Sequence, residues 1–178
     1  CFQKSIRGSD PDAALHYLAR LLKGGDLKSI GRRLLVIASE DIGLAYPSAI
    51  SIVKACVDAA LQVGLPEAQI NLSQAVILLA TSPKSNSAAQ GIGEAMADLE
   101  RRNLGELPAH LRDAHYGGAA KLGHGNGYKY AHDYPNHYVK QQYLPDELAG
   151  ETFYVPTDNG YERRIREHME RIRREAEE

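Results

Sequence analysis

Residues 10–38 read DPDAALHYLARLLKGGDLKSIGRRLLVIA, and this stretch decides the fold class. Its apolar side chains recur at three- and four-residue spacing, which predicts two amphipathic helices. Asp10 and Pro11 suit the N-cap and first position of the first helix, Gly24-Gly25 ends it, and Asp26 can cap the second. The two apolar stripes are Ala14, Leu15, Leu18, Leu21 and Leu22, then Leu27, Ile30, Leu34 and Ile37.

Three more helices are predicted downstream. One runs from Pro47 to Gly64, one begins at Pro66 and is broken by Pro83, and one spans about residues 85–102. The run AVILLA at 75–80 is apolar all round, so we expect its helix to be central and covered on most sides. Alternation of period two is absent, and residues 1–104 are therefore predicted to form an all-α helical bundle. In the helix from Pro47 to Gly64 the apolar stripe is Ile50, Val53, Val57 and Leu61. In the helix at residues 85–102 it is Ile92, Met96 and Leu99.

The composition changes after residue 104. Residues 116–143 contain six of the ten tyrosines together with five glycines, which excludes a long helix. We predict that residues 105–160 form an irregular Tyr/Gly-rich segment packed on the bundle, with a short strand or hairpin near 137–155 as an open alternative. Residues 161–178 are predicted to be a C-terminal helix, whose narrow apolar stripe either rests on the bundle or meets a partner subunit.

Composition sets limits on the function. The chain has 178 residues, of which 43% are hydrophobic and 25% charged, as in ordinary globular domains. The net charge of -2 argues against sequence-blind nucleic-acid binding by the whole surface. No run approaches the ~18 apolar residues of a membrane span, so no membrane partner is expected. Two cysteines, Cys1 and Cys56, indicate a reducing, cytoplasmic location. Because the chain begins Cys1-Phe2-Gln3 without Met, we expect it to belong to a longer protein.

No catalytic constellation stands out. A phosphate-binding loop needs G-x-x-x-x-G-K-[S/T], and the glycines around residue 125 have the wrong spacing. The pair His132-Asp133 is compatible with a divalent-metal site aided by His137, but a structural hydrogen-bonding role is favoured because the spacing is a weak ligand pattern. Glu40 and Asp41 follow the end of a helix, where the dipole disfavours carboxylates. They are predicted to be held by a cation, with Arg32, Arg33 or a neighbouring chain as the source.

Three spots are candidates for DNA or anion contact. Lys4 and Arg7 lie before the first predicted helix. Lys84 and Asn86 lie where a helix begins and free backbone N–H groups attract phosphate, although a plain helix cap is the favoured explanation. Lys121 and Lys129 are interleaved with Tyr128 and Tyr130, a mixture of cations and aromatic rings that suits single strands.

Five strings occur in one order along the chain: KSIRGSDPDAA (4–14), ASEDIG (38–43), PKSN (83–86), GYKYAHDYP (127–135) and QYLP (142–145). Together they resemble the C-terminal region of the MgsA/RarA family of AAA+ ATPases. These are the replication-associated recombination proteins, whose eukaryotic relatives are Werner-helicase-interacting proteins. The resemblance covers nearly the whole chain.

The resemblance implies a helical domain similar to a clamp-loader collar, through which family members form homotetramers. It implies a parent protein that is a DNA-stimulated ATPase at stalled forks, acting in replication, recombination and repair near single-stranded-DNA-binding protein. The family's ATP and Mg²⁺ sites lie in the upstream AAA+ domain, so no catalytic residue, metal or cofactor is assigned to this chain. The alternative function is a binding module, in which the Tyr/Lys loop contacts single-stranded DNA or a protein tail.

Overall fold

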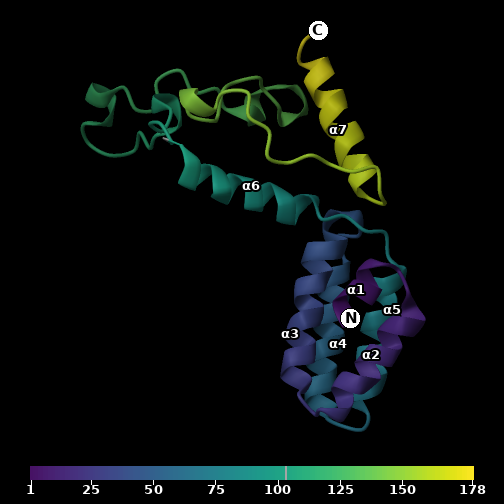
Figure 1. Ribbon diagram of the computed structural model, residues 1–178. Coiled ribbons are helices and arrows are strands. Elements are labelled where there is room, and N and C mark those ends of the chain that lie inside the picture. The colour runs from purple at the N-terminus through teal and green to yellow at the C-terminus, as the bar shows by residue number, and fades with distance from the viewer. Residues whose placement is uncertain (103) are drawn as a thin grey trace. The chain divides into compact units, whose positions relative to one another are not determined.

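The computed structural model describes residues 1–102 and 104–178, and the predicted all-α fold is confirmed. Within these residues there are α-helices and short 3₁₀ or π turns but no strand, so the strand or hairpin considered near 137–155 is wrong. The helices are α1 (Phe2–Arg7), α2 (Pro11–Lys23), α3 (Leu27–Ile37), α4 (Ala49–Val63), α5 (Ala68–Thr81), α6 (Ser87–Arg101) and α7 (Glu162–Glu175), shown in Figure 1.

The local signals in the sequence set the helix starts. Ala13 N donates to Asp10 Oδ1 at 2.9 Å, and Pro11 occupies the first turn of α2. Ser29 N donates to Asp26 Oδ1 at 3.0 Å at the start of α3. Each carboxylate satisfies a backbone donor that the helix itself leaves free, so both predicted caps are confirmed.

The chain forms two compact units. Unit 1 comprises residues 1–92 and 154–166, and unit 2 comprises residues 93–153 and 167–178. The three-part division into 1–104, 105–160 and 161–178 stays a prediction. Unit 1 holds the main hydrophobic core, to which each of the helices α1–α5 contributes buried side chains.

Helix α5 is central to unit 1, as predicted. It contacts α1, α2, α3 and α4, and Leu72, Val76 and Leu79 are fully buried. The other helices do not cover α5 completely, because the side chain of Ile77 remains 41% exposed. A close approach of α3 to α4 tightens the same core: a Cβ built on Gly31 would lie 2.7 Å from Val57 Cγ1.

Three elements of unit 1 were not predicted: helix α1, a π turn and a 3₁₀ turn at Gly43–Ala45. Helix α1 precedes the first predicted helix and buries Phe2 and Ile6 against the core. Residues Ala38–Ile42 extend α3 as a π turn that ends at Gly43, whose φ of +48° a side chain would strain. This π turn places Glu40 and Asp41 one after the other beside α1, where both contact its polar side chains and Asp41 is buried.

Two of the predicted apolar stripes, one of which was expected to face inward, are only partly buried. Val53 and Val57 of α4 are buried, but Ile50 and Leu61 are 37% and 46% exposed. In α6 the side chains of Ile92, Met96 and Leu99 are 63%, 56% and 50% exposed. Helix α6 begins in unit 1 and continues in unit 2, so its stripe does not face one core along its whole length.

Unit 2 is irregular apart from the ends of α6 and α7. Its chain is shaped by 3₁₀ turns at Ala109–Leu111, Ala119–Leu122, Ala131–Asp133, Pro135–His137 and Asp146–Leu148. Its described residues include four buried apolar side chains, Ala119, Val139, Leu148 and Ile172. Backbone hydrogen bonds within these turns, together with side-chain bonds to the backbone, order this part of the chain.

Candidate functional site

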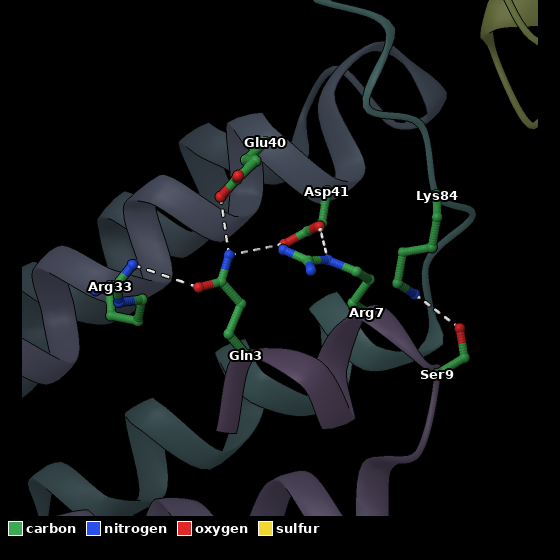
Figure 2. A network of polar contacts seen from close by, with 7 residues as sticks. All are labelled: Gln3, Arg7, Ser9, Arg33, Glu40, Asp41 and Lys84. Atoms are coloured by element: carbon green, nitrogen blue, oxygen red, sulfur yellow. Dashed lines mark hydrogen bonds and ion pairs between the residues drawn. The ribbon is translucent and has the colours of Figure 1, made fainter. Parts of the chain in front are cut away.

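The carboxylates at the π turn are held by polar side chains of α1, as Figure 2 shows. Arg7 Nε lies 2.6 Å from Asp41 Oδ1, and Gln3 Nε2 donates to Glu40 Oε2 at 2.8 Å. Arg33 Nη1 reaches Gln3 Oε1 at 3.3 Å. The prediction of a cation is confirmed, but Arg32 and Arg33 are wrong as its source. Asp41 is 4% exposed and the hydrogen bond to it raises the pKa of Arg7, so this ion pair is structural.

Lys84 is held inside the same region. Its Nζ donates to Ser9 Oγ at 3.0 Å, Ala80 O at 3.0 Å and Ser82 O at 2.6 Å, and burial lowers its pKa. These three acceptors match the three donors of an ammonium group. A role in DNA contact stays a prediction, and it would require Lys84 to exchange these bonds.

One cavity of about 570 Å³ brings Arg7 of the first predicted anion spot together with the second spot, but Lys4 does not line it. It is lined by Arg7, Lys84 and Asn86, but also by Glu40 and Asp41. Asn86 is exposed at this mouth. Because two carboxylates share the cavity with the two cations, its charge does not single out an anion as the ligand.

The start of α6 already has an anionic partner within unit 1. Glu162 is fully buried, and its carboxylate accepts hydrogen bonds from Ser85 Oγ at 2.7 Å and Ser87 Oγ at 2.5 Å. Thr157 N donates at 2.6 Å and Tyr154 OH at 3.2 Å. Desolvation raises the pKa of Glu162, but the hydrogen bonds outweigh it and the net pKa is lowered. The predicted capping role of this segment is supported by Ser85 Oγ, which accepts from Ser87 N at 3.3 Å. Glu162, which local sequence patterns did not single out, binds the hydroxyls of both serines.

The third predicted spot lies wholly in unit 2. Lys121, Lys129, Tyr128 and Tyr130 are exposed, with 46% and 54% of the two tyrosines accessible. Gln141 fixes this loop, because its Oε1 accepts from Lys129 N at 3.2 Å and its Nε2 donates to Lys129 O at 2.8 Å. Gln141 was not predicted as important. Its side-chain amide binds both the N–H and the C=O of one distant residue. No pattern of residue spacing in a sequence predicts such a contact.

The histidines of the predicted metal spot meet each other. His132 Nδ1 and His137 Nδ1 are 3.1 Å apart, and both side chains are exposed. Asp133 does not complete a ligand set, since no group of three or more His, Cys, Asp and Glu side chains suited to a metal occurs among the described residues. The pairing that the structure brings together is His132 with His137 rather than His132 with Asp133.

A groove of about 810 Å³ lies on unit 1 between α3, α4 and the start of α6. Its exposed apolar side chains are Val36, Leu61 and Ile92, at 42%, 46% and 63% exposure. Its rim carries both charge signs. The remaining lining residues are Lys28, Arg32, Leu35, Ser39, Glu40, Lys54, Val57, Asp58, Ala88 and Ala89.

The family model described as MgsA AAA+ ATPase C terminal matches residues 8–173. This chain belongs to that family. The resemblance that the five ordered strings indicated is therefore confirmed.

Relatives from bacteria and an amoeba align over most of the chain. Replication-associated recombination protein A of Bacillus subtilis is 58% identical over 159 residues, 89% of this chain and 38% of that protein. The protein of the same name from Escherichia coli K12 is 41% identical over 168 residues, 93% of this chain and 38% of that protein. ATPase WRNIP1 of Dictyostelium discoideum is 36% identical over 153 residues, 85% of this chain and 18% of that protein. The chain thus spans 38% of the length of its two bacterial relatives.

No helix within residues 1–102 and 104–178 combines the length and the apolar character that crossing a membrane requires.

Proposed function

We propose that this chain is the assembly module of a replication-associated AAA+ ATPase, joining copies of the protein into a homotetramer. The parent protein would act in replication, recombination and repair at stalled forks. ATP and Mg²⁺ would bind in an upstream AAA+ domain, and this chain would hydrolyse no ATP itself. The names of the relatives and their greater length support this division of labour.

The observation that carries the proposal is the apolar groove of unit 1. Burying Val36, Leu61 and Ile92 against a second copy would remove large apolar side chains from water. The rim carries Lys28 and Arg32 as well as Glu40 and Asp58, so a patch packed on a copy of itself can set opposite charges against each other. Exposed apolar surface bordered by charges is typical of protein interfaces.

Light scattering after size exclusion tests the proposal. We expect the chain to self-associate at tens of micromolar, and Leu61→Glu combined with Ile92→Glu to shift it toward monomer. Ile70→Glu is the matched control, because Ile70 is 65% exposed on α5 and does not line the groove. A wild-type chain that stays monomeric at that concentration, or equal dissociation by Ile70→Glu, would contradict the proposal.

A second candidate function is supported by the exposed Tyr/Lys loop of unit 2. Tyr128 and Tyr130 offer ring faces to nucleobases, and Lys121 and Lys129 offer charge to phosphates. The partner would be single-stranded DNA, or a tail of single-stranded-DNA-binding protein.

Fluorescence anisotropy with a labelled oligonucleotide tests this second function. Lys129→Ala should weaken binding and lower its dependence on salt, because one phosphate contact fewer releases one counterion fewer. Lys23→Ala, an exposed lysine of unit 1, serves as the control. Binding that is unaffected by both Lys129→Ala and Tyr130→Ala would remove this loop as the DNA contact.

A further inference from the structure

The irregular loop of unit 2 brings two imidazoles together at the cost of an unfavourable backbone. Asn136 and His137 are consecutive non-glycine residues with φ of +56° and +52°. Such conformations persist when the surrounding structure holds them. Here Asn136 Nδ2 donates to Glu175 Oε2 of α7 at 2.6 Å. The result is a turn that aims the ring of His137 at His132.

The geometry of the pair fits two ligands of one metal ion. Zn²⁺ bound at about 2.0–2.1 Å by imidazole sets neighbouring tetrahedral ligand atoms about 3.3 Å apart. His132 Nδ1 and His137 Nδ1 are 3.1 Å apart, their ring centroids are 4.8 Å apart, and the planes are tilted by 58°. Small ring rotations would therefore bring both nitrogens to one ion.

The surroundings of the pair also suit an ion. Both histidines are exposed, so an ion and its water ligands have access. Tyr130 packs beside His132 with the ring centroids 5.1 Å apart, which restricts the orientation of one ligand. In the metal-free pair one Nδ1 donates a hydrogen bond to the other Nδ1. Both Nδ1 atoms must be without a proton to bind a metal ion, so the donating ring would then carry its proton on Nε2.

Unit 2 has a small hydrophobic core, so a bound metal ion could contribute to its stability. Four buried apolar side chains are few for a unit of this size, and small domains with small cores are commonly stabilised by a disulfide or a metal. Both cysteines, Cys1 and Cys56, lie in unit 1, so no disulfide can form within unit 2. A cross-link between the turns at 131–133 and 135–137 would fix the loop that carries the exposed tyrosines.

We propose that His132 and His137 bind a late first-row divalent cation, Zn²⁺ or Ni²⁺, with water completing its coordination. Imidazole nitrogen favours these ions over Mg²⁺ or Ca²⁺, which prefer oxygen ligands. The site is independent of self-association through unit 1. It differs from the site considered in the sequence, because Asp133 is not a ligand and no hydrolysis is implied.

Isothermal titration of the untagged chain with ZnCl₂ tests the site. One equivalent should bind, and His132→Ala and His137→Ala should each weaken binding by at least about tenfold. His115→Ala is the matched control, because His115 is an exposed histidine of unit 2 whose Nδ1 pairs with Asp113 Oδ1 at 2.7 Å. MgCl₂ should give no binding at the same concentrations.

A second readout separates ligand loss from unfolding. In a spectrum of histidine side-chain nitrogens, substoichiometric ZnCl₂ should shift Nδ1 of His132 and His137 before those of other histidines, and His132→Gln should abolish both shifts while the remaining peaks stay in place. Absence of zinc binding would refute the proposal. So would adventitious binding that His132→Ala and His115→Ala weaken equally.

Discussion

The buried carboxylate of Glu162 provides the sharpest test of how unit 1 is held together. Replacing it with alanine removes the shared acceptor of four donors: the hydroxyls of Ser85 and Ser87, the N–H of Thr157 and the phenol of Tyr154. The Ser85 hydroxyl can still donate to Ser87 Oγ, which lies 3.0 Å away. A hydrogen bond to a charged group contributes about 1.5–3 kcal/mol, and such bonds are not additive when they share one acceptor. Partial entry of water offsets part of the loss. We expect Glu162→Ala to lower the free energy of unfolding by about 3–5 kcal/mol, which is less than the sum over four such bonds.

Replacing Glu162 with glutamine separates the contribution of its charge to stability from the contribution of its size and shape. The glutamine oxygen can keep the bond from Thr157 N, while its NH₂ group faces hydroxyls that can rotate to accept. We expect Glu162→Gln to cost about 1–2 kcal/mol, clearly less than Glu162→Ala. The double mutant of Glu162→Ala with Ser87→Ala should cost less than the sum of the single mutants, because the two side chains share one bond.

Acid should remove the same stabilisation. The folded pKa of Glu162 is lowered, so its contribution is complete above the usual glutamate pKa of about 4.3 and is lost as the pH falls through the folded pKa. The stability difference between wild type and Glu162→Gln should therefore narrow as the pH is taken below about 4.

Urea unfolding followed by far-ultraviolet circular dichroism measures these differences, since the chain has no tryptophan to report on them. Glu167→Ala is the control, because Glu167 is exposed on the same helix. If Glu162→Ala lies within about 0.5 kcal/mol of wild type, as surface substitutions usually do, the carboxylate does not tie residues 154–162 to the start of α6.

Four other perturbations have defined outcomes. Asp10→Ala should cost about 1 kcal/mol in urea unfolding, because α2 loses the side chain that accepts from Ala13 N. Gly31→Ala should cost about 1–3 kcal/mol, since the added Cβ meets Val57, and Val57→Ala in the same chain should recover most of it. Arg7→Met should destabilise unit 1 by leaving buried Asp41 without its cation, and adding Asp41→Asn should restore stability in a thermal melt. Gln141→Ala should speed hydrogen exchange at the amide of Lys129 while leaving the amides of α5 protected.

The helices from residue 11 to residue 101 were predictable because their signals are local. Asp10, Pro11 and Asp26 mark starts within one turn of the residues that they affect. Helix α1 carries no such signal, since it has six residues and no side-chain cap. Its place is fixed by burial of Phe2 and Ile6 in the core of unit 1, which local periodicity does not express.

The polar contacts of the candidate sites were harder to predict for a different reason. Arg7 and Asp41 are 34 positions apart, and Glu162 is 77 positions from Ser85. Charge arguments correctly required a cation near Asp41, because a carboxylate after a helix end is unfavourable. They could not choose among the arginines, since that choice depends on how α1 packs. In the sequence, Glu162 is one of several glutamates in a highly charged helix, and nothing distinguishes it from the exposed ones.

The two units differ in what holds them together, and this difference bears on function. Unit 1 buries the side chains of five helices, so its fold can tolerate substitutions on the exposed groove that we assign to assembly. Unit 2 buries few apolar side chains, and its loop depends on single polar contacts such as Gln141 with Lys129 and Asn136 with Glu175. A loop held in this way opens at low energetic cost, because each contact is exposed to competition from water. A ligand that bridges the loop, whether a metal ion at His132 and His137 or a strand of DNA on the tyrosines, would therefore order unit 2 without changing the core of unit 1.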